Sequence, residues 1–284
     1  MKKQQLIVAF TGILLLLGLY FWGNTVSTQK KTPTSSKEKS PGESQLGITD
    51  ILQASESKLN PERQAYVTRL KNAVVRGDIK DQQLKAYHQL AAFWKDSVED
   101  SFLPAAYYMG EAAKLENSEK SLTFAAQLFL NNLRGQHPAL KTWMANEAKE
   151  LFEKALQISP GNDSARIGLG GSYIFGGSAE NPQEIMQGIQ QILEVVRKDS
   201  NNMYAQFMLG LGGIESKQFD KAIERLNRVV RNQPENLEAI ITLAEAYDQK
   251  GDKPNAIMWY ETAKKKIGNE EMNKEIDQRI NALR

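Results

Sequence analysis

The sequence contains no cysteine among its 284 residues. This absence excludes disulfide bonds, thiolate metal sites, cysteine nucleophiles and a lipid attached to cysteine. Histidine is almost as scarce, because the chain has only His88 and His137. Neither histidine has a neighbouring carboxylate at the spacing of a metal-binding set. From these absences we expect no metal site, and we expect no cofactor.

The sequence also lacks the short motifs that mark common active sites. It has no GxSxG nucleophile elbow, no HExxH zinc motif and no Walker phosphate-binding loop. The glycine-rich run from Gly168 to Gly177 lacks both the GxGxxG spacing and a following lysine. Its helical context favours a packing role, with Gly170 at a close helix contact and Gly176 near a helix end. We expect no enzymatic activity and no small-molecule substrate.

Neither sign of charge is in excess. The chain has 36 basic and 34 acidic residues, which gives a net charge of +2. Lys2 and Lys3 account for this difference, so the rest of the chain carries equal numbers of each sign. Proteins that bind nucleic acid present a dense basic face. The balance of charge therefore argues against nucleic acid as a partner.

One long hydrophobic run lies near the N-terminus. The segment from Leu6 to Trp22 has no charged residue, and its 17 residues would span about 26 Å as a helix, close to the thickness of a bilayer core. The run is longer than a typical signal-peptide core, and it ends in an aromatic cluster suited to a membrane interface. We predict a transmembrane anchor over residues 1–26, with a cleaved signal peptide as the alternative.

The residues around this run predict the topology. Lys2 and Lys3 precede the run and favour a cytoplasmic N-terminus, whereas Lys30 and Lys31, which would favour the opposite orientation, lie eight or more residues beyond it. We therefore expect a single-pass protein of the bacterial inner membrane whose remaining residues face the periplasm. Residues 27–47 are rich in Ser, Thr, Lys, Pro and Gly and have almost no apolar residue. Such a segment cannot bury enough apolar surface to offset the entropy lost on ordering, so we predict a disordered linker.

The most informative feature of the sequence is a repeat. Residues 203–236 and 237–270 are two units of 34 residues whose apolar positions align, for example Leu209 with Leu243. Each unit has two runs of apolar residues at helical spacing, separated by a turn. A pair of helices cannot cover its own apolar face, so such units must stack on neighbours. We predict an array of helix pairs.

These units resemble the tetratricopeptide repeat (TPR). The resemblance rests on the unit length, on small residues at matching helix positions, on the Gly251-Asp252 turn and on Pro234 at the end of the first unit. The tryptophan that is common near the start of a TPR is absent, and Gln206 and Ile240 stand in its place. The resemblance implies an all-α fold, a right-handed TPR-type α-solenoid, with a concave face that binds proteins.

The helical pattern extends upstream and downstream of the two clear units. We predict an N-terminal helical cap over residues 48–80, a TPR array of about five repeats over 81–270 and a C-terminal cap helix over 271–284. Two of the repeats have extra residues between their helices. These extra residues are RGQHPALKTW (134–143) and GGSAENPQ (176–183).

Within the predicted cap, the apolar pattern indicates two helices. The first spans residues 50–59 and the second spans residues 61–76. Proline in the first turn of the second helix is compatible with a helix start, and Gly77-Asp78 follows its end.

The TPR resemblance also implies a binding groove. In TPR proteins, particular positions of the first helix of each repeat face the groove. Transferred to this sequence, they give the candidate partner-binding residues Gln127, Asn131, Ile174, Phe175, Tyr204, Phe207, Leu211, Ile241, Glu245 and Asp248. We expect a groove that is apolar through its middle and acidic at its C-terminal end. Alternatively, Phe207 and Leu211 fill the core between repeats.

These features together predict a membrane-anchored, non-catalytic scaffold or adaptor that binds a protein or peptide segment. A second resemblance, over residues 165–236, is to the periplasmic TPR part of bacterial cytochrome c maturation proteins. It rests on the enlarged loop and on repeat residues common to many TPR proteins. It implies an alternative function as a chaperone that holds apocytochrome for haem attachment.

Overall fold

The computed structural model describes residues 47–76, 79–97, 102–176 and 182–284. The predicted anchor and nearly all of the predicted linker lie outside these ranges. No helix within the ranges is long and apolar enough to cross a membrane. The anchor over residues 1–26 therefore stays a prediction.

The described residues form thirteen α-helices and no strand, which confirms the predicted all-α class. All of the described residues belong to one compact unit. Its helices are α2 (Ile48–Ser57), α3 (Pro61–Arg76), α4 (Lys80–Ser97), α5 (Phe102–Glu116), α6 (Glu119–Asn131), α7 (Pro138–Ile158), α8 (Asp163–Gly176), α9 (Pro182–Lys198), α10 (Met203–Glu215), α11 (Phe219–Asn232), α12 (Leu237–Lys250), α13 (Lys253–Lys264) and α14 (Glu270–Leu283).

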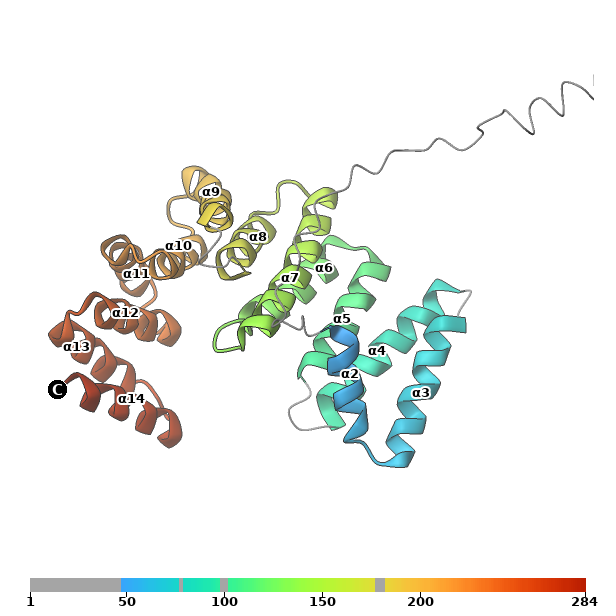
Figure 1. Ribbon diagram of the computed structural model, residues 1–284. Coiled ribbons are helices and arrows are strands. Elements are labelled where there is room, and N and C mark those ends of the chain that lie inside the picture. The colour runs from blue at the N-terminus through green and yellow to red at the C-terminus, as the bar shows by residue number, and fades with distance from the viewer. Residues whose placement is uncertain (1–46, 77–78, 98–101, 177–181) are drawn as a thin grey trace, which may run out of the picture. The chain divides into compact units, whose positions relative to one another are not determined.

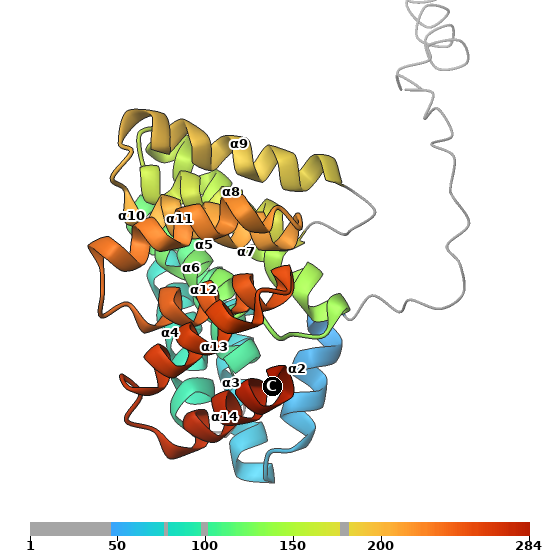
Figure 2. The same cartoon turned by 90° about the vertical axis from the view of Figure 1, so that its left-hand side faces the viewer.

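From α4 onward the helices pack as successive pairs, namely α4/α5, α6/α7, α8/α9, α10/α11 and α12/α13. The second helix of each pair contacts the first helix of the next pair, and α14 packs against α13. The first helices α6, α8, α10 and α12 also contact one another in succession. They therefore share one face of the stack, which we call the first-helix face. Figure 1 shows the row of pairs, and Figure 2 shows it turned by 90°. This arrangement is an α-solenoid.

A glycine allows the helices α8 and α9 to approach closely. A Cβ atom on Gly170 would lie 2.5 Å from Ile192 Cγ1 and 2.7 Å from the backbone oxygen of Gly188. Carbon atoms in favourable contact are about 3.5–4.0 Å apart. Any larger residue at this position would therefore force the two helices apart. The packing role predicted for Gly170 is confirmed.

Asparagine side chains start three of the first helices. The Oδ1 atoms of Asn162, Asn202 and Asn236 accept hydrogen bonds of 2.9 to 3.0 Å from the backbone N–H three residues later. These N–H groups belong to the first turn, where no carbonyl of the helix itself can accept from them. The three caps therefore fix where α8, α10 and α12 begin.

The hydrophobic core has two parts. A smaller cluster joins the N-terminal helices, with Leu59 and Val67 in the same cluster as Leu90 and Trp94 of α4. A larger cluster runs from α5 to α14. The cap predicted over residues 48–80 thus shares its core with α4, a helix that the sequence pattern groups with the array.

The extra residues of the α6/α7 pair lengthen both the second helix and the connection that precedes it. Helix α7 has 21 residues, and residues 132–137 connect it to α6. Gly135 in this connection has a φ of 81°, in the left-handed region that favours glycine. Leu133 is fully buried and ties the connection to the core. The extra residues of the α8/α9 pair fall largely on 177–181, outside the described residues.

Candidate functional site

A cleft of about 180 Å³ opens on the first-helix face. Its lining comes mainly from α6, α8, α10 and α12. We call its buried residues the floor, and they are Leu130, Phe175, Phe207, Met208 and Leu211. We call the other lining residues the rim, and they are Asn131, Arg134, Met203, Tyr204, Gln233, Asn236 and Glu238. The cleft therefore has an apolar floor and a largely polar rim.

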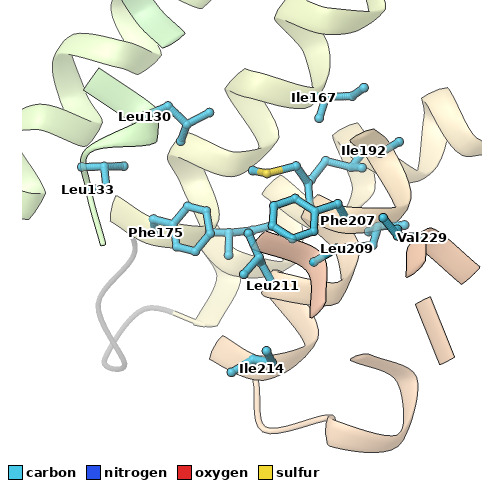
Figure 3. Close-up of a cluster of buried hydrophobic side chains, with 14 of the residues drawn as sticks. Leu130, Leu133, Ile167, Phe175, Ile192, Phe207, Leu209, Leu211, Ile214 and Val229 are labelled. Carbon is cyan, nitrogen blue, oxygen red and sulfur yellow. The ribbon is translucent and has the colours of Figure 1, made fainter. Parts of the chain in front are cut away.

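The floor contains three of the predicted groove residues. Phe175, Phe207 and Leu211 are only 5, 8 and 5% exposed to solvent. All three belong to the main core cluster. Figure 3 shows their side chains close together, with Leu130 and Leu133 beyond Phe175. Both interpretations of Phe207 and Leu211 therefore apply, because each side chain packs between repeats and also lines the cleft.

A glycine in α8 brings the floor together. A Cβ atom on Gly171 would lie 2.4 Å from Met208 Cε and 3.3 Å from the two Cδ atoms of Leu130. Side chains from α6 and α10 therefore meet over the backbone of α8. Because any side chain at position 171 would occupy the space that Met208 fills, this glycine determines the shape of the floor.

A hydrogen-bonded bridge joins α6 to α10 at one end of the cleft. The amide nitrogen of Gln127 donates to Tyr204 Oη over 3.0 Å and to Asn131 Oδ1 over 2.6 Å. Burial raises the pKa of Tyr204 above its ordinary value, and the hydrogen bond with Gln127 offsets this only in part. The phenol therefore stays neutral at physiological pH. The structure brings these three predicted groove residues together, two of them on the rim.

The predicted residues of α12 lie beside the cleft but do not line it. Ile241, Glu245 and Asp248 are half-buried. Glu245 forms an ion pair of 2.6 Å with Arg134, and a second one of 3.6 Å with Arg279 of α14. The acidic end expected for the groove stays a prediction, and one of its carboxylates, Glu245, is paired with two arginines of the same chain.

Ile174 departs from the sequence prediction. Its side chain is 1% exposed, so a partner has almost no surface there to contact. Its Cδ1 atom lies 3.0 Å from the point that a Cβ atom on Gly212 of α10 would occupy. Ile174 therefore packs against α10 inside the core, while its neighbour Phe175 lines the cleft.

The sequence prediction missed several residues of this face. Arg134 reaches the rim because the extra residues after α6 carry it there, and insertions have no counterpart in the repeat pattern. Phe124 is 57% exposed. Among the large apolar residues that are exposed in the described part of the chain, it is the one aromatic residue. It lies seven residues before Asn131, nearly two helical turns, so both side chains leave α6 in similar directions. Helical spacing was the signal that could have found Phe124.

The lining of the cleft combines apolar side chains with amide groups and few ionisable groups. Its ionisable groups are Arg134, Tyr204 and Glu238, and it contains no Ser, Thr, His, Lys or Asp. Within the described ranges, no three or more His, Cys, Asp or Glu side chains are grouped to hold a metal ion. His88 and His137 are both exposed. The cleft can bury an apolar side chain and form hydrogen bonds with a polypeptide backbone.

Known proteins resemble this chain in fold. Residues 214–272 match the family model of the tetratricopeptide repeat. No curated protein matches the sequence. Among solved structures, TTC0263, a thermophilic TPR protein in Thermus thermophilus, is 16% identical and covers 72% of this chain and 98% of its own, with a TM-score of 0.52.

Two other structures have lower scores. MamA from Desulfovibrio magneticus RS-1 (residues 41 to the end) is 19% identical and covers 64% of this chain and 94% of its own, with a TM-score of 0.43. YrrB, described as a TPR protein with an unusual peptide-binding site, is 15% identical and covers 74% of this chain and 97% of its own, with a TM-score of 0.41.

The likeness to TTC0263, at a TM-score of 0.52, shows a shared fold, whereas the scores of the other two support no further conclusion. The likeness to cytochrome c maturation proteins includes the loop at 177–181, outside the described residues, and stays a prediction. The part of the chain that the structure describes therefore has the fold of a TPR solenoid, and residues 214–272 carry the repeat in a form that the family model matches directly.

Proposed function

We propose that this protein is a non-catalytic scaffold or adaptor that binds a segment of another polypeptide on its first-helix face. The observation that carries the proposal is the cleft of about 180 Å³ with its floor of buried apolar side chains. An apolar cavity of about 150 Å³ admits a benzene molecule. The cleft therefore has room for one aromatic or large aliphatic side chain of a partner.

The rim supports a polypeptide partner because its amide groups match a peptide backbone. Asn131 and Gln233 are exposed, and side-chain amides both donate and accept hydrogen bonds. Asn131 accepts from Gln127, and Gln233 accepts from Asn236, so each uses its oxygen within the protein. The NH₂ group of each can donate to a carbonyl oxygen of the partner. Such bonds orient a segment without specifying its sequence.

Phe124 adds a second apolar contact for the partner. Its distance from Asn131 along α6 is about 10 Å, from seven residues at about 1.5 Å each. Aromatic residues, phenylalanine included, are enriched at protein–protein interfaces relative to the rest of the protein surface. A segment that fills the cleft and extends along α6 would therefore reach Phe124.

The proposal includes a membrane location. Residues 1–26 anchor the scaffold in the bacterial inner membrane through Leu6 to Trp22, and the array faces the periplasm. The support is the uncharged apolar run and the two lysines that precede it. Residues 27–47 then tether the array to the bilayer.

The experiment is peptide selection with a pair of matched variants. The full chain, held in detergent micelles, selects from a displayed library of random peptides, and the selected peptides are then measured for affinity. Asn131→Trp places a bulky ring at the rim, whereas Asn132→Trp places it at the next residue, an exposed position that does not line the cleft.

We expect selected peptides to share one aromatic or large aliphatic residue. Because a well-seated anchor contributes about 2 kcal/mol or more, Asn131→Trp is expected to weaken binding at least about tenfold. Asn132→Trp is expected to bind as the unmodified protein does. Equal binding by all three proteins would show that the cleft is not the binding site.

A further inference from the structure

Helix α12 presents a row of carboxylates beside the cleft. Glu238 is exposed on the rim, and Glu245 and Asp248 follow on the same side of the helix. Seven residues separate Glu238 from Glu245 and three more separate Glu245 from Asp248, spacings that keep helical side chains on one side. Such a row attracts positive charge, and part of that charge comes from within the protein.

Arg134 supplies this charge from the connection between α6 and α7. It lies 111 residues before Glu245 in the sequence, and its Nη2 atom is 2.6 Å from Glu245 Oε2. The neighbouring Leu133 is fully buried, so the backbone at this point is held firmly while the Arg134 side chain remains 43% exposed. The side chain lines the cleft and reaches across to α12.

In the ion pair between Arg134 and Glu245, another cation can replace Arg134 at low cost. Ion pairs in which one partner is this exposed stabilise a protein little, because water screens the charges. Glu245 has a second partner, since Arg279 of α14 lies 3.6 Å from its other oxygen. Arg279 also donates a hydrogen bond of 3.4 Å to Tyr260 Oη, which holds it in place. If Arg134 moves away, Glu245 is therefore still compensated by Arg279.

We propose that Arg134 occupies a subsite for a positively charged residue of the partner. In this proposal the bound segment places its apolar anchor in the cleft and a lysine or arginine against Glu245, and Arg134 is displaced. The partner is thus a basic segment with an apolar anchor. This inference rests on the proposed function and specifies the chemistry of its ligand.

An acidic residue of the partner is disfavoured by the same charges. A partner carboxylate that bound Arg134 would come close to Glu245, the present partner of Arg134, in a cleft whose rim also carries Glu238. Like charges brought together at an interface reduce affinity. A basic residue is instead attracted to Glu245, so charge complementarity selects it.

The test uses two variants of the same ion pair, with opposite expected effects. Peptides are selected by the full chain in detergent, and their affinities for the Arg134→Ala and Glu245→Gln variants are then measured. We expect the selected peptides to carry Lys or Arg near the apolar anchor. Arg134→Ala removes the internal competitor, so these peptides are expected to bind about two- to fivefold more tightly. Glu245→Gln removes the acceptor, so the same peptides are expected to bind more weakly.

A control variant breaks a comparable pair away from the cleft. Lys198 forms an exposed ion pair of 3.2 Å with Asp163, and Lys198→Ala is expected to leave peptide affinity unchanged. Circular dichroism of each variant checks that the fold is retained. Arg134→Glu adds a carboxylate at the exposed position and is expected to tighten binding further than Arg134→Ala.

The outcomes separate this inference from the proposed function. Peptides rich in Asp or Glu, together with weaker binding by Arg134→Ala, would show that Arg134 contacts the partner directly and would overturn the inference while leaving the proposed function in place. Unchanged affinity in both Arg134→Ala and Glu245→Gln would overturn it as well. Failure of both the unmodified chain and Arg134→Ala to select any peptide would overturn the proposed function, and the inference with it.

Discussion

At the scale of the residue, Ile174 and Phe175 show how much one position along a helix matters. Neighbouring side chains leave a helix about 100° apart, and here one enters the core while the other lines the cleft. The TPR resemblance assigns both to the groove, because it identifies the helix and its approximate register. Which of the two faces outward depends on the rotation of α8 against α10. The sequence of α8 alone does not contain that information.

Gly170 provides a test of packing at this scale. Gly170→Ala puts a methyl group against Ile192 and the backbone of Gly188, and the backbone cannot move without separating α8 from α9. We expect the free energy of unfolding to fall by about 1–3 kcal/mol, the usual cost of overpacking. The measurement is urea denaturation followed by circular dichroism.

The control for this prediction is Gly161→Ala. A Cβ atom at Gly161 would have no other atom within 4 Å, so this variant is expected to change stability by less than about 0.5 kcal/mol. Equal effects of the two alanine substitutions would contradict the packing account.

At the scale of the element, the helices follow closely from the sequence. The predicted helix over 61–76 has the same bounds as α3, and the predicted 50–59 begins and ends two residues later than α2 (48–57). Periodic apolar residues with clear start and stop signals were sufficient for this. The sequence pattern does not determine the length of α7, because the extra residues 134–143 are compatible with a longer helix and with a longer turn.

The asparagine caps offer a test at this scale. Asn202→Ala removes the side-chain oxygen that accepts from the backbone N–H of Ala205 at the start of α10. Loss of such a cap costs about 1 kcal/mol, so a lower midpoint of thermal unfolding is expected. Asn201→Ala, at the exposed preceding residue, is the matched control and should leave the midpoint nearly unchanged. A similar shift in both variants would argue against the cap.

At the scale of the whole described unit, the cleft depends on contacts between distant parts of the chain. Gln127 and Tyr204 are 77 residues apart, and Arg134 and Glu245 are 111 residues apart. Repeat patterns define which helices pair, but they do not define how closely the first helices of successive pairs approach. That approach depends on particular residues, such as Gly171, where the lack of a side chain leaves room for Met208. The array and several residues that line the cleft, among them Phe175, Phe207 and Leu211, were therefore predictable, whereas the shape of the cleft and the Arg134–Glu245 pair were not.

The proposed membrane location is testable at the same scale. Protease added to intact spheroplasts is expected to digest the array, because the proposal puts residues 48–284 outside the inner membrane. A cytoplasmic protein in the same sample serves as the control for lysis. Protection of the array until the membrane is dissolved would contradict the periplasmic orientation.

The central claim is that a side chain of the partner occupies the cleft on the first-helix face. The most direct measurement is photo-crosslinking with a selected peptide whose anchor residue is replaced by benzoylphenylalanine, followed by mass spectrometry of the crosslinked sites. The account predicts crosslinks to Phe207, Met208 and Leu211, and their loss in Asn131→Trp. Crosslinks confined to α9, α11 and α13, or unchanged in Asn131→Trp, would contradict it.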